Sequence, residues 1–171
     1  AEETNLGNGV YLSRGYQKHE PPKENMSVYV STVRPKVLKV DKKQETITID
    51  LFNFLTWEDL RIKTNFTEAD KVNDGIKFIF EVAELPLWTP YYYIPNLSEW
   101  KSAYHPLNIN IVQIVPYGPF LTKNSTFVQK VENGRCTIFC GFDHSLFPMD
   151  EQRCPFRFAS MSRNLRLLLY D

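Results

Sequence analysis

The residue types that most often carry chemistry are few in this chain, and their spacing does not suit catalysis. His19, His105 and His144 lie far apart, without the short spacings of metal-binding histidines. The sequence contains no Gly-rich phosphate loop, no Gly-x-Ser-x-Gly elbow and no Cys-x-x-Cys pair. Carboxylates are numerous, but no pair stands out from the charged background. We therefore expect a protein that is not an enzyme and that uses neither a metal nor a cofactor.

The three cysteines are the more informative residues. Cys136 and Cys140 share one face of an extended segment, too far apart along the chain to bond each other comfortably. Thirteen residues separate Cys140 from Cys154, and this segment ends in Phe-Pro-Met-Asp-Glu-Gln-Arg over residues 147–153. A bridge closing a loop of this size would stabilise the fold by roughly 3 kcal/mol in the chain-entropy model.

Composition and charge exclude several classes of protein. The 171 residues include 20 Lys+Arg and 20 Asp+Glu, so the chain lacks the positive charge of a typical nucleic-acid binder. Apolar residues make up 43% and charged residues 23%, which argues against disorder. No apolar run approaches the ~20 residues that a membrane-spanning helix needs. We expect one folded domain, soluble when taken alone.

Four Asn-x-Ser/Thr sequons indicate the compartment. Average composition gives roughly one such match in a chain of this length, so any single match can arise by chance. Four together favour an extracellular glycoprotein, in a compartment where a disulfide would also persist. Because residues 1–4 lack the features of a signal peptide, we expect that one has been removed. The predicted glycosylation sites are Asn25, Asn65, Asn96 and Asn124.

The elements that must position these residues are predicted to be strands. Apolar residues alternate with a period of two over residues 28–32, 47–51 and 76–82, which is typical of an antiparallel sandwich or barrel. Before residue 24 the chain is polar and predicts at most a short helix, which Pro21-Pro22 would end. Residues 85–106, rich in proline and aromatics, predict a structured loop. Turn signals occur at residues 41–43, 73–75, 117–119 and 133–134.

The strand predicted at residues 47–55 carries large aromatic side chains on its polar face. Phe52 and Phe54 point away from the aliphatic face, beside Thr48 and Asp50. Aromatic rings in that position indicate that another surface, either a subunit or a ligand, covers them. The alternative is a strand that is buried on both faces.

The segment from Cys140 to Cys154 resembles the signature loop of the Cys-loop receptors, the pentameric ligand-gated ion channels of the nicotinic acetylcholine receptor type. Their pattern is two cysteines separated by thirteen residues, with Phe-Pro-Phe/Met-Asp-x-Gln before the second. Secreted acetylcholine-binding proteins typically have one residue fewer. The resemblance implies a Cys140–Cys154 disulfide and leaves Cys136 as a free thiol. It also implies a loop that couples ligand binding to a pore, with these residues at its tip: Phe147, Pro148, Met149 and Asp150.

The resemblance extends over nearly the whole chain. Trp57-Glu58-Asp59-Leu60-Arg61 matches the family's Trp-x-Asp-x-Arg element, and Trp88-Thr89-Pro90 is similar to its Trp-x-Pro segment. The implied fold is all-β, an immunoglobulin-like twisted sandwich of about ten strands with a short N-terminal helix. Residues 1–171 would be a single extracellular ligand-binding domain, with a helical or loop segment at 1–24 and the sandwich at 25–171. Family domains continue through two further strands that cap the pocket, so we expect these strands either to lie outside this sequence or to be absent.

Family pockets hold a cationic amine between aromatic side chains, and this chain departs from that pattern. Pro95 and Met161 stand where the family has aromatics, whereas Phe52 keeps the aromatic of the complementary face. A lysine at position 130 would repel a cation. The resemblance therefore implies an atypical pocket that binds acetylcholine weakly or not at all. The implied ligand-binding residues are Phe52, Tyr91, Tyr92, Tyr93, Val128, Lys130 and Met161.

The implied function is that of the extracellular ligand-binding domain of a neurotransmitter-gated channel subunit at the plasma membrane. Identical or related subunits would form a pentameric ring, with a small ligand in the cleft between them and a pore domain outside this chain. No nucleic-acid partner is expected. Two alternatives remain: a secreted soluble protein that buffers a ligand, and a subunit that assembles without a working pocket.

Overall fold

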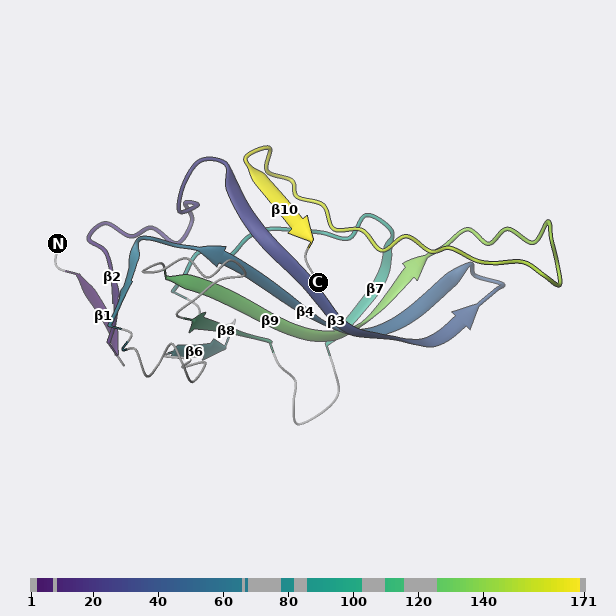
Figure 1. Ribbon diagram of the computed structural model, residues 1–171, viewed down its shortest axis with the longest axis horizontal. Helices are drawn as coiled ribbons and strands as arrows, with labels where there is room; N and C mark the ends of the chain where they lie inside the picture. The colour runs from purple at the N-terminus through teal and green to yellow at the C-terminus, as the bar shows by residue number, and fades with distance from the viewer. Residues whose placement is uncertain are drawn as a thin grey trace.

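The computed structural model of the chain describes these residues: 3–7, 9–65, 67, 78–81, 86–102, 110–115 and 126–169. Regular structure in these ranges consists of strands, arranged in two sheets (Figure 1). The larger sheet has the order β10-β3-β4-β9-β8-β6, and β7 also pairs with β9; the smaller has the order β1-β2-β5. The strands are β1 (Thr4–Gly7), β2 (Val10–Leu12), β3 (Met26–Asp41), β4 (Thr46–Glu58), β5 (Ile62–Thr64), β6 (Phe78–Glu81), β7 (Leu97–Ser102), β8 (Asn110–Val115), β9 (Phe127–Phe139) and β10 (Leu165–Leu169).

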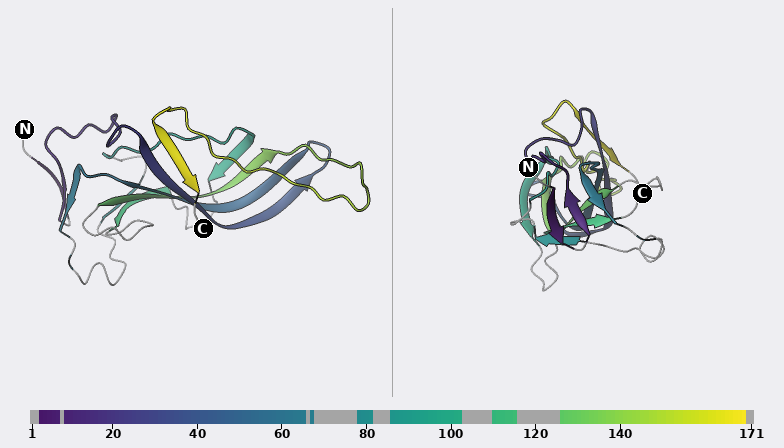
Figure 2. Two further views of the ribbon diagram at one scale, coloured as in Figure 1. Left: turned by 45° about the horizontal axis from the view of Figure 1, so that its top comes forward. Right: turned by 90° about the vertical axis from the view of Figure 1, so that its left-hand side faces the viewer.

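The long strands β3, β4 and β9 run side by side along the molecule (Figure 2) and carry most of the core. On β4, Leu51, Leu55 and Trp57 are at most 2% exposed, whereas Phe52 and Phe54 between them are partly exposed. This alternation places one face of the strand in the interior. The all-β sandwich predicted from the sequence is therefore confirmed, with one difference in pairing: β10 lies parallel to β3.

A second layer covers the interior face of the large sheet. It consists of residues 86–96 and 155–160, whose backbones pair at Tyr93 and Ala159. Tyr92 and Phe158 pack against both groups of buried side chains in the core. The smaller of these groups contains Leu51, Ile94, Cys136 and Ile138.

The expectation of a short N-terminal helix is wrong, because strands β1 and β2 occupy that region. β2 pairs with β1 on one side and with β5 on the other. Val10 and Leu12 are buried, and Tyr11 between them is partly exposed. Two buried residues separated by one fit the period of a strand and not that of a helix. No helix in the described ranges has the length and apolar character needed to cross a membrane.

Two further sequence-based expectations are corrected around β7 and β9. The segment 85–106 was expected to be a loop, but β7 lies within it and pairs with β9. Asn133-Gly134 was expected to be a turn, but both residues lie inside β9. Gly134 is needed there because the indole of Trp100 packs directly over it: a Cβ atom on Gly134 would lie 2.3 Å from Trp100 Cζ2. A glycine inside a strand can mark such a close approach rather than a turn.

The Gly134→Ala variant is expected to lose about 1–3 kcal/mol of unfolding free energy, the usual cost of forcing an extra methyl group into a filled site. Urea unfolding followed by tryptophan fluorescence measures the effect. Gly141→Ala is the matched control, because a Cβ there has no neighbour within 4 Å. Equal midpoints for the two variants would show that Trp100 does not pack on Gly134.

Candidate functional site

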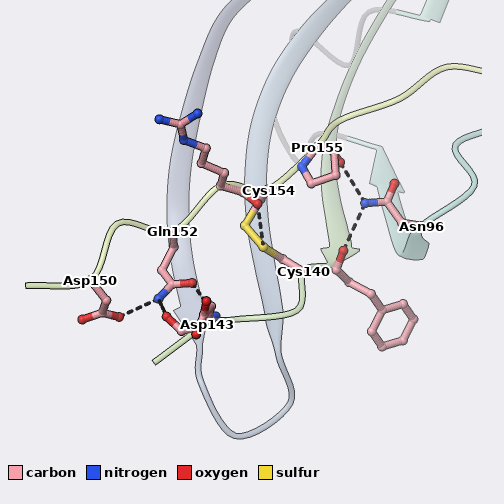
Figure 3. The surroundings of a disulfide bond; sticks show 9 residues. Asn96, Cys140, Asp143, Asp150, Gln152, Cys154 and Pro155 are labelled. Carbon is pink, nitrogen blue, oxygen red and sulfur yellow. Dashed lines mark hydrogen bonds between the residues drawn. A yellow bond between two sulfur atoms is a disulfide. The ribbon is translucent and has the colours of Figure 1, made fainter. Parts of the chain in front are cut away.

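A disulfide joins Cys140 to Cys154, with their Cα atoms 5.3 Å apart (Figure 3). Cys136 is a buried free thiol. Both findings confirm the pairing implied by the resemblance. The loop between the joined cysteines projects from one end of the molecule, past the ends of β3, β4 and β9 (Figure 1). The Cys140 amide donates to the carbonyl of Glu45 (2.8 Å), which fixes the base of the loop to the β3–β4 turn.

Hydrogen bonds within the loop define its shape (Figure 3). Gln152 Nε2 donates to the Asp143 carbonyl (2.6 Å) and to Asp150 Oδ2 (2.5 Å), and the Asp143 amide donates to Gln152 Oε1 (2.9 Å). His144 Nδ1 lies 3.2 Å from Asp150 Oδ2. The Gln152 amide holds the pKa of Asp150 below its usual value, and the Ser145 amide does the same for Asp143. Both carboxylates are therefore ionised at neutral pH.

The tip of the loop presents apolar side chains to solvent. Leu146, Phe147 and Met149 are at least 69% exposed, next to Pro148. Apolar groups gathered in this way are typical of a contact surface. The structure thus shows a stiffened, anionic loop with an apolar tip, and its coupling role stays a prediction.

Asn96 closes the loop from outside, a role that the sequence did not reveal. Its Nδ2 atom donates to the carbonyl of Phe139 (3.0 Å) and to the carbonyl of Pro155 (2.9 Å), so one amide group bridges the residues that flank the two cysteines (Figure 3). The Phe139 amide donates in turn to the Asn96 carbonyl (2.8 Å). We call these three residues the Asn96 clamp.

One cluster of predicted ligand-binding residues lies on the second layer. Tyr91, Tyr93 and Met161 are all exposed, Tyr91 and Met161 by 80% or more. The Tyr93–Ala159 pairing and a hydrogen bond from Ser160 Oγ to the Tyr91 carbonyl (3.5 Å) bring the two segments together. Tyr92 differs, because its ring packs inward against Phe158. We call Tyr91, Tyr93 and Met161 the tyrosine half-site.

A second cluster lies on the outer face of the large sheet. Phe52 and Phe54 are partly exposed there, as the period-two argument predicted. Their direct partners on β9 are Asn133 and Val131, whose side chains therefore share this outer face. Val33, opposite Phe52 on β3, is also exposed. We call Phe52 and Phe54 the phenylalanine half-site.

Val128 and Lys130, which were expected beside Phe52, are on the wrong face of β9. Val128 is fully buried in the larger core group, and Lys130 also points into the sandwich, where its Nζ lies 5.8 Å from the centre of the Tyr92 ring. Side chains alternate between the two faces along a strand, so an alignment of β9 that is shifted by one residue exchanges the side chains that point inward with those that point outward. Val131 and Asn133 are the residues that take their place.

Lys130 instead forms an ion pair inside the sandwich. Its Nζ lies 3.0 Å from Glu132 Oε2, and the two side chains are 17% and 11% exposed. Burial lowers the pKa of Lys130 and raises the pKa of Glu132 to about 7, while the Asn53 amide beside Glu132 acts in the opposite direction. Asn53, fully buried, accepts a hydrogen bond from Thr32 Oγ1 (2.9 Å). Polar groups thus occupy the middle of the core.

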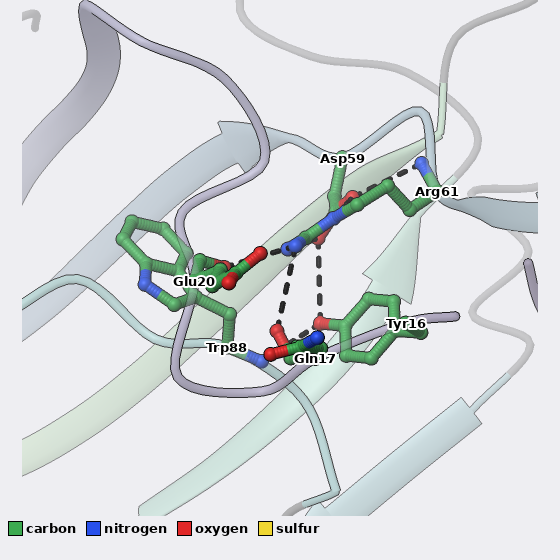
Figure 4. Close-up of polar contacts among 6 residues, drawn as sticks. All are labelled: Tyr16, Gln17, Glu20, Asp59, Arg61 and Trp88. Carbon is green, nitrogen blue, oxygen red and sulfur yellow. Dashed lines mark hydrogen bonds and ion pairs between the residues drawn. The ribbon is translucent and has the colours of Figure 1, made fainter.

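The Trp-x-Asp-x-Arg element forms a second buried ion pair (Figure 4). Arg61 donates from Nε to Asp59 Oδ1 and from Nη2 to Oδ2, both at 2.9 Å, and the Asp59 side chain is completely buried. Arg61 Nη1 also donates to the Glu20 carbonyl (2.9 Å). Tyr16 lies under the guanidinium, its hydroxyl accepts from the Trp88 amide (2.8 Å), and burial raises its pKa to about 12. This cluster fastens residues 13–20 to the sandwich.

The predicted glycosylation sites differ in their surroundings. Asn25 and Asn65 are exposed, whereas Asn96 is partly buried within the Asn96 clamp. Asn124 lies outside the described residues. Glycosylation at each of these positions stays a prediction.

The two half-sites lie on opposite sides of one subunit. Tyr91 and Tyr93 of the tyrosine half-site belong to the layer that covers the interior face of the large sheet, and Met161 directly follows that layer. The phenylalanine half-site projects from the other face of β4. One chain therefore cannot bring its own two half-sites together. Two copies placed side by side can do so, if each turns a different half-site toward the other.

Comparisons with known proteins identify the family to which the chain is similar. Residues 9–170 match the family described as neurotransmitter-gated ion-channel ligand binding domain. The chain is 21% identical over 170 residues to the acetylcholine receptor subunit delta of Xenopus laevis, covering 97% of this chain and 30% of that protein. It is 23% identical over 167 residues to the same subunit of Gallus gallus, covering 95% and 30%. It is 25% identical over 155 residues to the acetylcholine receptor subunit alpha-type acr-16 of Caenorhabditis elegans, covering 87% and 28%. The chain thus spans about 30% of the length of the curated relatives it matches.

Proposed function

Because the chain belongs to the neurotransmitter-gated ion-channel ligand-binding domain family, we propose that it is the extracellular ligand-binding part of a receptor subunit. Membership of a family of receptor channels also confirms that the chain is not an enzyme. Subunits would assemble as a pentamer at the plasma membrane. A small ligand would bind between the tyrosine half-site of one subunit and the phenylalanine half-site of the next.

The observation that carries this proposal is the separation of the two half-sites. Each consists of exposed or partly exposed aromatic or apolar side chains on paired backbone, and neither encloses a ligand alone. Pockets bury most of a small ligand's surface between several walls. The site would be complete only when two subunits meet, so ligand binding would favour one arrangement of the subunits over another.

The disulfide loop would relay that rearrangement to a pore domain. Its internal hydrogen bonds make it stiff enough to move as a unit, and Phe147, Pro148 and Met149 present an apolar surface for contact. The soluble ligand-buffering protein remains a second candidate with the same fold. The exposed apolar tip favours the receptor, because a freely soluble protein gains nothing from such a surface.

The assembly can be tested by cysteine cross-linking between the half-sites. A Phe52→Cys/Tyr93→Cys variant of the expressed chain is expected to give, on oxidation, a non-reducing ladder that ends at five subunits. Lys63→Cys/Tyr93→Cys is the matched control, because Lys63 is an exposed residue of β5 in the smaller sheet, away from the phenylalanine half-site on β4. A Phe52→Cys/Tyr93→Cys chain that stays monomeric would contradict the proposed cleft.

The ligand preference is tested by calorimetry on the same assembly. We expect acetylcholine to bind weakly or not at all, because Met161 and Pro95 supply no ring faces for a quaternary ammonium group. Tight, saturable acetylcholine binding would show that Tyr91 and Tyr93 are sufficient for a conventional pocket.

A further inference from the structure

We propose that Asn25 and Asn65 carry N-linked glycans, whereas the sequon at Asn96 is left unmodified because its amide nitrogen is used to close the disulfide loop. This inference rests on the extracellular location proposed above. The three sequons are alike in sequence. They differ in the surroundings of the asparagine side chain nitrogen, which is the atom that would carry the sugar.

The Asn96 clamp is incompatible with a sugar on its nitrogen. Transfer of an oligosaccharide from its lipid-linked pyrophosphate forms a bond between the sugar C1 and the amide nitrogen. The bond between C1 and the pyrophosphate oxygen breaks, the pyrophosphate leaves with that electron pair, and the nitrogen loses one proton. A glycosylated Asn96 Nδ2 would keep a single hydrogen, so it could not donate to both the Phe139 and the Pro155 carbonyls as it does here (3.0 and 2.9 Å).

Steric crowding acts in the same direction. Asn96 Nδ2 lies between the two backbone segments that leave the disulfide, and Asn96 Oδ1 is buried (Figure 3). The first sugar would have to occupy the space that these segments fill. A chain modified at Asn96 therefore could not form the native closure of the loop, and we expect the folded population to lack this glycan.

Asn25 and Asn65 meet no such restriction. Both are exposed, and the structure describes no hydrogen bond made by either side chain amide. Asn25 has a φ of 56° and lies directly before β3, while Asn65 directly follows β5 and its backbone amide donates to the Gly9 carbonyl (3.2 Å). Their side chains project from the ends of strands, where a bulky glycan is accommodated in solvent.

The two exposed sequons also lie far from the disulfide loop. The β3–β4 turn contacts Cys140 through Glu45, and the 16 residues of β3 separate that turn from Asn25. At about 3.3 Å per residue, the distance along the strand is roughly 50 Å. β5 pairs with β2, at the end of the molecule opposite the loop (Figure 1). Glycans at these two positions would leave the loop end bare for contact with another domain.

The test is a site-resolved glycan map of the secreted full chain. Peptide N-glycosidase treatment in heavy-oxygen water marks each asparagine that carried a sugar, and peptide mass spectrometry then reads positions 25, 65 and 96 separately. We expect the label at Asn25 and Asn65 and none at Asn96. A label at Asn96 in folded protein, or none at both Asn25 and Asn65, would overturn the inference. Neither result bears on the cross-linking test of the half-sites.

Matched variants separate the clamp from the sequon. Ser98→Ala removes the sequon and keeps the Asn96 amide, so we expect no change in intact mass beyond the substitution and no change in urea midpoint. Asn96→Asp removes both donors and is expected to lower the midpoint. Ser27→Ala and Asn65→Gln should each remove the mass of one glycan. The loss of a glycan from Ser98→Ala would contradict the proposal as directly as the glycan map.

Discussion

Replacing Asp59 with asparagine is expected to destabilise the domain by about 3–5 kcal/mol, the cost of leaving one member of a buried ion pair without its partner. Asp59 accepts two charge-assisted hydrogen bonds from Arg61 and is fully buried. An asparagine would turn one donor toward the Arg61 fork and remove the negative charge. Because Arg61 also holds the Glu20 carbonyl, the N-terminal segment should loosen as well.

Urea unfolding of the purified domain gives the loss of stability, and limited proteolysis within residues 13–20 reports the loosening. Glu58→Gln is the matched control on the neighbouring residue: its ion pair with Lys23 is long (3.5 Å) and half-exposed, so about 1 kcal/mol or less should be lost. If Asp59→Asn is not secreted, Tyr16→Phe provides a milder change in the same cluster. An Asp59→Asn domain as stable as the control would show that the pair contributes nothing.

Much of the candidate site follows from patterns that a strand imposes on its sequence. The alternation along β4 placed Phe52 and Phe54 on the outer face. The structure confirms this placement, because the flanking residues Leu51 and Leu55 are buried in the core. The disulfide was predicted from the spacing and order of the family's loop residues. These predictions succeeded because each depends on residues that are near one another in sequence.

The errors share a different cause. Lys130 was expected in the wall of the binding cleft because the family resemblance aligned it there, and only the alternation of side chains along β9, set by the buried Val128 and Cys136, shows that it points inward. Gly134 was interpreted as a turn because its reason, the Trp100 ring, comes from another strand. The double use of Asn96 likewise depends on carbonyls about 40 and 60 residues away. Contacts between distant segments leave no local pattern.

The buried Lys130–Glu132 pair should respond to pH in a way that differs between its two members. Lys130→Met leaves Glu132 buried without a counter-charge and is expected to cost about 3–5 kcal/mol at pH 8. The stability of the variant itself should rise as the pH falls toward 5.5, because the Glu132 carboxyl, whose folded pKa is raised to about 7 even beside Lys130, accepts a proton and becomes neutral. Its unfolded pKa is near 4.5, so the recovery should occur between about pH 7 and 4.5.

Glu132→Gln should show the opposite dependence. It leaves a charged Lys130 in the core, where burial already lowers the pKa of the amine, so the variant should be least stable at low pH and recover only as the pH rises and Lys130 loses its proton. Lys130→Met combined with Glu132→Leu removes both charges and is expected to be as stable as the native domain or more so. Urea midpoints at pH 5.5, 8 and 10 measure all three variants, with Lys101→Met, which breaks an exposed pair with Glu99, as the control. A buried acid left alone regains stability as the pH falls, and a buried base left alone regains it as the pH rises. If the urea midpoints of Lys130→Met and Glu132→Gln change with pH in the same direction, the two charges are not confined to the interior.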